Sequence, residues 1–271
     1  MKITTLVENT TANPCCTAEH GLSIYVETDN HKLLVDAGQT DALIKNASVL
    51  GIDLAQIDTV VLSHGHYDHS GGIMPFSEIN PDARIIMQST AAEPRYHGER
   101  YIGIDKRITN LPGALLIDGN MKIDDELFIF SGIKGRRCYP QGNHVLKRIV
   151  DKEEVCDDFS HEQCLVITCS GKKVLVSGCA HNGILNIIDR YTELTGDTPD
   201  YVISGFHMMK KEGAFTADEE AVIIETAGEL SKMNTIFFSG HCTGEPAFDI
   251  MKKIMKDKLN ALHTGESILN L

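Results

Sequence analysis

A dense group of metal-ligand side chains follows a short apolar run in the first third of the chain. Residues 59–62 predict a buried strand, and residues 63–69 that follow read Ser-His-Gly-His-Tyr-Asp-His. Six consecutive residues thus supply three imidazoles and one carboxylate: His64, His66, Asp68 and His69. A polar surface turn does not require this density of nitrogen and oxygen donors, whereas a metal site does. The glycines at 71–72 then let the backbone turn away sharply.

The order of apolar strand, small residue and histidine recurs at three later points. Strands are predicted at 174–177, 201–204 and 235–239. Each is followed within a few residues by a histidine, namely His181, His207 and His241. Ligands bind at the carboxyl ends of strands in open α/β sheets, so these side chains are expected to converge. One such histidine is most simply a strand-end residue with a hydrogen bond. Four such histidines, counting His64, predict a shared metal, because clustered imidazoles would otherwise each need a separate buried hydrogen-bond partner.

Strand and helix patterns alternate along most of the chain. Residues 22–27 and 32–35 predict a β-hairpin. Further strands are predicted at 1–7, 83–87, 127–130 and 164–168, and helices at 40–50, 182–194, 216–233 and 245–259. The third of these helices opens with a Thr216-x-x-Glu219 capping box. This order predicts a mixed sheet covered by helices, an α/β (α+β) fold.

Nothing in the sequence divides the chain into separate domains. Its 271 residues contain no Pro/Ser linker, low-complexity segment or repeat of solenoid length, so we expect a single domain over 1–271. The stretch 93–143 has the least regular pattern and contains several glycines, prolines and basic residues. We expect a long excursion near the pocket there, as a lid or a pocket wall.

Charge and composition restrict the partners and the location. A formal net charge of -13 argues against non-specific binding to nucleic acid, but a metal can still attract an anionic substrate. No apolar run approaches the ~18 residues of a membrane span, and the N-terminus does not resemble a signal peptide. We therefore expect a cytoplasmic protein that acts on a small, anionic molecule, with no nucleic-acid or membrane partner. The oligomeric state is not predicted.

The cysteines predict reduced thiols rather than a disulfide framework. The chain has eight cysteines but no C-x-x-C pair, which in a large chain without a leader favours free buried thiols. Cys179 and Cys242 differ from the others, because each lies within two residues of a strand-end histidine.

The motif His64-x-His66-x-Asp68-His69 after an apolar strand resembles the signature loop of the metallo-β-lactamase superfamily. Residues 35–38 (Val-Asp-Ala-Gly) and 239–241 (Ser-Gly-His) resemble its early strand turn and its last histidine, so the resemblance covers essentially the whole chain. It implies a four-layer αββα sandwich. Segments 19–23, 178–184, 205–207 and 240–244 further resemble a subgroup often named 7,8-dihydropterin-6-methyl-4-(β-D-ribofuranosyl)aminobenzene-5′-phosphate synthase.

The resemblance implies two metal sites. In that superfamily the first two histidines of the signature loop bind one metal, the Asp-His pair binds a second, and histidines later in the chain complete both metal sites. His64, His66, Asp68, His69, His181 and His241 are accordingly the predicted ligands. Cys179 stands where typical members carry a metal-bridging aspartate, so occupancy of the second site is open. His161 lies at the typical spacing for the third histidine of the first site and remains the alternative to His181, which lies inside the subgroup motif.

The nitrogen-rich donor set favours Zn²⁺, as one or two ions, with another divalent metal as the alternative. Such an ion activates water at neutral pH, which predicts a hydrolase of a small phosphate-bearing or acyl substrate. Asp68 is expected to orient the nucleophile. His207 (or His181) is expected to protonate the leaving group. His207, His20 and Cys179 are the predicted substrate contacts.

Other functions stay open beside hydrolysis. The subgroup name implies a transferase that joins a dihydropterin diphosphate to an aminobenzene ribotide. A di-iron oxidoreductase is disfavoured, because members of that kind carry Glu in place of His66 and an added flavin domain. A metal-free binding protein is the remaining alternative. Four basic residues are candidate anion contacts, although solvated surface charge is the simpler interpretation: Arg136, Arg137, Lys210 and Lys211.

Overall fold

The computed structural model describes residues 1–210 and 213–271. Its first sheet has seven strands in the order β18-β1-β2-β3-β4-β5-β8. Their bounds are β1 (Lys2–Val7), β2 (Ser23–Glu27), β3 (Lys32–Val35), β4 (Thr59–Val61), β5 (Arg84–Gln88), β8 (Ala114–Ile117) and β18 (Ser267–Asn270). The four strands β3, β4, β5 and β8 run parallel, so their carboxyl ends meet at one edge of the sheet.

The second sheet also has seven strands, in the order β17-β16-β15-β14-β13-β10-β9. Their bounds are β9 (Met121–Lys122), β10 (Leu127–Phe130), β13 (Cys164–Cys169), β14 (Lys172–Val176), β15 (Tyr201–Ile203), β16 (Ile236–Ser239) and β17 (Leu259–Ala261). The strands β14 to β17 are parallel, which places the residues after β14, β15 and β16 side by side.

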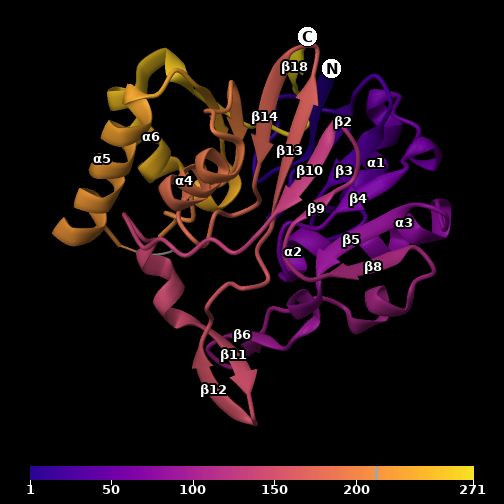
Figure 1. Cartoon of the computed structure of the whole chain (residues 1–271), viewed down its shortest axis with the longest axis horizontal. Coiled ribbons are helices and arrows are strands. Elements are labelled where there is room, and N and C mark those ends of the chain that lie inside the picture. The colour runs from indigo at the N-terminus through magenta and orange to yellow at the C-terminus, as the bar shows by residue number, and fades with distance from the viewer. Residues whose placement is uncertain (211–212) are drawn as a thin grey trace.

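Three apolar clusters separate four layers (Figure 1). Between the sheets, residues such as Ile24 and Val35 pack in one cluster with Leu165 and Val176. The outer face of the first sheet packs against α1 (Ala42–Leu50) and α3 (Ile73–Ile79), and that of the second against α4 (Ile184–Thr195), α5 (Ala217–Lys232) and α6 (Glu245–Met255). Each fully buried Leu, Ile or Phe contributes roughly 1.5–3 kcal/mol. The predicted αββα sandwich is confirmed.

A third, four-stranded sheet projects from the sandwich, at the bottom of Figure 1. It has the order β12 (Glu153–Cys156), β11 (Leu146–Val150), β6 (Arg95–His97) and β7 (Arg100–Tyr101). Between residues 93 and 143 the chain therefore contributes strands to all three sheets. The remaining short helices are α2 (Tyr67–Ser70) and the 3-10 turns η1 (Leu54–Gln56), η2 (Ser89–Ala92), η3 (Lys106–Asn110), η4 (Gln141–Val145), η5 (His241–Thr243) and η6 (Lys256–Lys258).

The predicted elements are present, with one clear error at the C-terminal end. The Thr216 capping box is confirmed at α5, where the Thr216 hydroxyl accepts from the Glu219 N–H and the Glu219 carboxylate accepts from the Thr216 N–H. The helix predicted at 245–259 is too long. It ends at Met255, because Lys256 has a φ of 51°, and a 3-10 turn at 256–258 then leads into β17. Within the described residues, no helix is long and apolar enough to cross a membrane.

His31 connects the two main sheets at their rim. It follows β2, and its Nδ1 lies 3.1 Å from Asp58 Oδ1, while its Nε2 lies 2.5 Å from Asp124 Oδ2. Burial disfavours the charged ring, but the hydrogen bonds and charges of the two carboxylates outweigh burial and raise the pKa of His31. A raised pKa means that the folded state binds the proton more tightly than the unfolded chain.

Replacing His31 with Gln is therefore expected to destabilise the protein more at low pH than at high pH. The contribution of His31 is fully present below the unfolded pKa of about 6.5 and is lost as the pH rises through the folded value. Urea unfolding at pH 6 and pH 9 measures this difference, which we expect to be about 1 kcal/mol. The exposed His144→Gln variant is the control. If His31→Gln lowers the free energy of unfolding equally at both pH values, a charged His31 between Asp58 and Asp124 does not stabilise the fold.

Candidate metal centre

The predicted first-site histidines converge with their Nε2 atoms unpaired. His64 and His66 follow β4, and His181 follows β14. Their ring centroids lie 4.6 Å (His64–His66) and 4.8 Å (both pairs with His181) apart, and all three side chains are buried. None of the three Nε2 atoms has a hydrogen-bond partner among the described residues. Buried polar nitrogens are normally paired, so this arrangement fits a bound cation.

Hydrogen bonds set the ring orientation of His64 and His181. The Ser63 hydroxyl donates to Asp36 Oδ2 and so accepts from His64 Nδ1 at 2.8 Å. The Nδ1 of His181 donates to Asn143 Oδ1 at 3.0 Å. Each ring therefore carries its proton on Nδ1 and presents an Nε2 lone pair, the form that binds metals. Burial first, and neighbouring imidazoles second, lower the pKa of both histidines and of His66, which keeps the rings neutral.

A second group of donors lies beside the first. His69 Nε2 is 3.2 Å from His241 Nε2, and His241 Nε2 is 3.4 Å from Asp68 Oδ2. The Nδ1 atoms again face outward: that of His69 donates to Asp36 Oδ2 at 2.6 Å, and that of His241 to Asn9 Oδ1 at 2.9 Å. Burial opposes the charge on His69, but Asp36 and Asp68 raise its pKa to about 9. A cation bound here would displace that proton, as metal binding to histidine does.

Cys179 lies between the two groups. Its Sγ is 3.1 Å from His69 Nε2, and it shares a set of donor atoms with each group, the atoms of each set lying within 4.8 Å of one another. One set is completed by His64 and His181, and the other by His69 and His241. A thiolate at this position is within reach of both groups. The side chain also borders the cavity described below.

His161 is close to the first group, but its two ring nitrogens face Gly65 and Asp157. Its ring lies 6.0 Å from His64 and 5.5 Å from His66. Its Nδ1 accepts a 2.8 Å hydrogen bond from the Gly65 N–H, so the proton of the neutral ring lies on Nε2. That Nε2 lies 3.4 Å from Asp157 Oδ2, although without good hydrogen-bond geometry. Burial first, then Arg95, lower the pKa of His161 to about 4.

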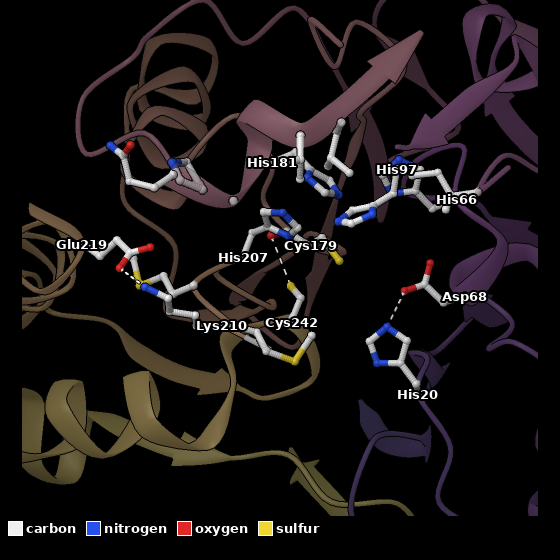
Figure 2. A pocket seen from close by; sticks show the side chains of 18 of the residues that line it. His20, His66, Asp68, His97, Cys179, His181, His207, Lys210, Glu219 and Cys242 are labelled. Carbon is white, nitrogen blue, oxygen red and sulfur yellow. Dashed lines mark hydrogen bonds and ion pairs between the residues drawn. The ribbon is translucent and has the colours of Figure 1, made fainter. Parts of the chain in front are cut away.

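A cavity of about 580 Å³ opens beside these residues (Figure 2). His66, Asp68, Cys179 and His181 lie at its inner end, and His207, after β15, lines it with its ring 4.1 Å from that of His181. His20 also lines it, with Nε2 3.3 Å from Asp68 Oδ2. His64, His69 and His241 complete the donor groups behind this lining.

The outer cavity is mainly apolar with basic groups at its rim. Its apolar lining comes mostly from the segment before α5, from α5 and from the third sheet: Ile102, Val145, Leu146, Met208, Met209, Phe215, Val222 and Ile223. The Arg100 guanidinium lies 4.7 Å above the Tyr67 ring. Lys210 also lines the cavity and pairs with Glu219 at 2.6 Å. Arg136 and Arg137 are not among the described lining residues, and Lys211 lies outside the described residues.

Several residues that orient the site were not predicted from the sequence. Glu8 Oε1 accepts from the His241 N–H at 2.6 Å, and Asn9 holds the ring of the same histidine. Glu162 accepts from the backbone N–H of His181 at 2.6 Å. Glu8 and Asn9 directly follow β1, so the rule that led to the strand-end histidines would have found them. Asn143 and Glu162 come from loops and gave no such signal.

The chain belongs to the metallo-beta-lactamase superfamily, whose model matches residues 16–212. A crystal structure described as Tm1679, a metal-dependent hydrolase of the beta-lactamase superfamily, covers 100% of this chain and 99% of its own, with a TM-score of 0.84 and 30% identity. An uncharacterized protein of Methanocaldococcus jannaschii is 32% identical over 75% of this chain and 78% of its own length.

A second relative from Methanocaldococcus jannaschii carries the subgroup name. It is the 7,8-dihydropterin-6-methyl-4-(beta-D-ribofuranosyl)-aminobenzene-5'-phosphate synthase, 27% identical over 99% of this chain and 96% of its own length. The resemblance stated from the motifs is therefore confirmed. Membership of the superfamily, together with the clustered His, Cys and Asp donors, implies a divalent metal.

The buried pair of Arg95 and Asp157 supports the loop that carries the first two histidines. Arg95 Nε lies 3.0 Å from Asp157 Oδ2, and both side chains are fully buried. Asp157 faces His161, which in turn accepts from Gly65, the residue between His64 and His66. Removing one partner of such a pair leaves a buried charge without compensation.

We expect Asp157→Asn to lower the free energy of unfolding by about 3–5 kcal/mol. Asp158→Asn is the matched control, because Asp158 is the next residue but pairs with Arg148 at a half-exposed position. The control is expected to lose less than about 1 kcal/mol. Urea denaturation of both variants checks this, and equal small losses would show that the buried pair does not stabilise the loop.

Proposed function

We propose that this protein is a metal-dependent hydrolase that uses metal-activated water on a small substrate with a phosphate or acyl group. The observation that carries the proposal is the convergence of histidine Nε2 atoms in two adjacent groups, one of His64, His66 and His181 and one of His69 and His241. A binding protein without a metal would leave three of these buried nitrogens unpaired. The whole-length likeness to a structure described as a metal-dependent hydrolase supports the same conclusion.

His181 is the third ligand of the first site in this proposal. Two features favour it over His161. Its ring lies nearer to both partner histidines, and its Nε2 lone pair is free. His161 uses its Nδ1 lone pair on Gly65 and carries a proton on Nε2, so it acts as a support for the loop. His161 as a ligand would require that hydrogen bond to break.

Asp68, His69 and His241 form the second site, with Cys179 in place of the usual bridging carboxylate. A set of imidazole, thiolate and one carboxylate suits Zn²⁺, whereas Mg²⁺ prefers oxygen ligands. When bound, such an ion would lower the pKa of its water to about 7 and polarise the substrate oxygen. We propose two zinc ions for the complete centre.

The residues of the chain itself supply orientation and proton transfer. Asp68 Oδ2 lies between His20 and His241 and can direct one oxygen toward the attacking water. Burial disfavours its charge, but His69, His20 and His241 outweigh burial and hold the pKa of Asp68 well below its usual range. His207 lines the cavity with its ring 4.1 Å from that of His181, so we propose it as the group that donates a proton to the leaving group.

The cavity favours a substrate with an apolar body and a negative charge. A volume of about 580 Å³ exceeds what a small acyl group alone would fill. Its mainly apolar outer lining suits a ring system, and Arg100 and Lys210 at the rim, like the metals, suit an anion. Because the net charge of the chain is -13, an anionic ligand would depend on these basic groups and on the bound metal for its attraction.

Zinc content of variants tests the ligand assignment. We expect His64→Ala and His181→Ala to lose at least one zinc ion per chain by mass spectrometry of the dialysed protein. Hydrolysis of bis(p-nitrophenyl) phosphate and of a p-nitrophenyl ester should fall at least about 100-fold, because the nucleophile is no longer activated. His161→Ala is the matched control and should retain its zinc. Loss of zinc in His161→Ala with retention in His181→Ala would reverse the assignment.

A transferase is the second candidate, favoured by the synthase relative that is 27% identical over 99% of this chain. In this alternative the same centre would hold the diphosphate of a dihydropterin, and the aromatic amine ribotide would replace water as the nucleophile. The apolar outer cavity also suits a pterin ring.

Incubation of the zinc-loaded protein with both pterin-pathway substrates separates the two candidates. The hydrolase proposal predicts no condensed product by liquid chromatography and mass spectrometry, together with cleavage of the phosphodiester or ester. A condensed product that depends on both substrates and on the metal would establish the transferase and overturn the hydrolase.

A further inference from the structure

Two cysteines far apart in the sequence meet at the floor of the cavity. Cys179 follows β14, and Cys242 lies in η5 after β16. Their Sγ atoms and a ring nitrogen of His207 lie within 4.8 Å of one another. The Sγ of Cys242 also lies 3.5 Å from the Cys179 carbonyl oxygen, the contact drawn in Figure 2. Both residues line the cavity.

A glycine makes this approach feasible. Strand β15 lies between β14 and β16, whose ends are thus two strand spacings, about 10 Å, apart. The sulfur of Cys242 reaches across the end of β15, at Gly205. A Cβ at Gly205 would lie 2.4 Å from the Cys242 Sγ, so any side chain there would displace the sulfur. The space that a side chain at position 205 would need is therefore occupied by the thiol of Cys242.

We propose that Cys179 and Cys242 form a reversible disulfide across the cavity floor when the protein meets a peroxide. One thiol attacks hydrogen peroxide to give a sulfenic acid and water. The second thiol then attacks that sulfur, the S–S bond forms, and a second water leaves. Two thiols lose two electrons and two protons, and the peroxide is reduced to two waters. The sulfurs need to approach to about 2.05 Å from a separation of at most 4.8 Å.

The cavity decides which cysteines can react in this way. Cys179 and Cys242 are only 3% and 4% exposed, but the cavity of about 580 Å³ gives a molecule as small as hydrogen peroxide direct access. The other six cysteines of the chain are not among the described lining residues. Cys15 and Cys156 are exposed, and oxidants reach them without the cavity.

The disulfide has a consequence for the metal centre. Cys179 belongs to both donor groups, so its oxidation removes a thiolate from each. Zinc in turn is expected to protect Cys179, because a metal-bound thiolate is a poorer nucleophile. This consequence, unlike the disulfide itself, rests on the proposed function.

Peptide mapping of the full-length protein tests the disulfide directly. The metal-free protein is treated with hydrogen peroxide, alkylated, digested with trypsin without reduction and analysed by mass spectrometry. The tryptic peptides 174–190 and 233–252 contain Cys179 and Cys242 as their single cysteines. We expect most of both peptides to appear as one linked species that dithiothreitol separates. Peptides that are oxidised but unlinked, or linked to other cysteines, would overturn the proposal.

Variants and zinc provide the controls. Cys156→Ser, at an exposed strand, should leave the linked species unchanged, whereas Cys242→Ser should abolish it and leave peptide 174–190 unlinked. If Cys242→Ser does not fold, the peptide map of the wild-type protein still tests the disulfide. Prior loading with zinc should slow formation of the link at least about 10-fold. A link that forms equally fast with zinc would support the disulfide and contradict Cys179 as a ligand, so the two proposals can fail separately.

Discussion

The buried carboxylate of Asp36 is the interaction on which the rest of the site depends. Asp36 directly follows β3, and its Oδ1 accepts from the Ser63 N–H at 2.7 Å. Its Oδ2 accepts from the Ser63 hydroxyl at 2.7 Å and from His69 Nδ1 at 2.6 Å. Because the Ser63 hydroxyl then accepts from His64, one carboxylate sets the ring orientation in both donor groups. A negative charge with 0% side-chain exposure is tolerable only with such partners.

Backbone strain accompanies this arrangement at the ends of the strands. Asp36, Ala180, His207 and His241 all have φ between 49° and 62°, a region that costs a residue other than glycine roughly 1–2 kcal/mol. Such residues persist where the surrounding structure holds them, and they cluster at functional sites. Here the sandwich supplies the stabilisation, through three apolar clusters that fix the two sheets and their helices. The strained turns then direct the donor atoms toward the centre and the cavity.

The layers, and the grouping of the strand-end histidines, could be predicted from the sequence because both depend on local patterns; the roles of these histidines as metal ligands stay predictions. Apolar strands and the histidines after them are read from a few adjacent residues, and parallel strands bring their ends together. The choice between His161 and His181 depends on which ring nitrogen faces inward, and that depends on Gly65 and Asn143, which spacing does not reveal. The third sheet was missed because β12 is fully exposed and lacks an apolar pattern. A single domain over 1–271 and a cytoplasmic location stay predictions.

The central claim is that histidine Nε2 atoms converge on two metal positions. Crystals grown with zinc and measured on both sides of its absorption edge test it most directly. The account predicts two anomalous peaks, one about 2.1 Å from the Nε2 atoms of His64, His66 and His181, and one beside Asp68, His69 and His241. A peak bound by His161, with the hydrogen bond from Gly65 broken, or no peak among these histidines, would contradict it.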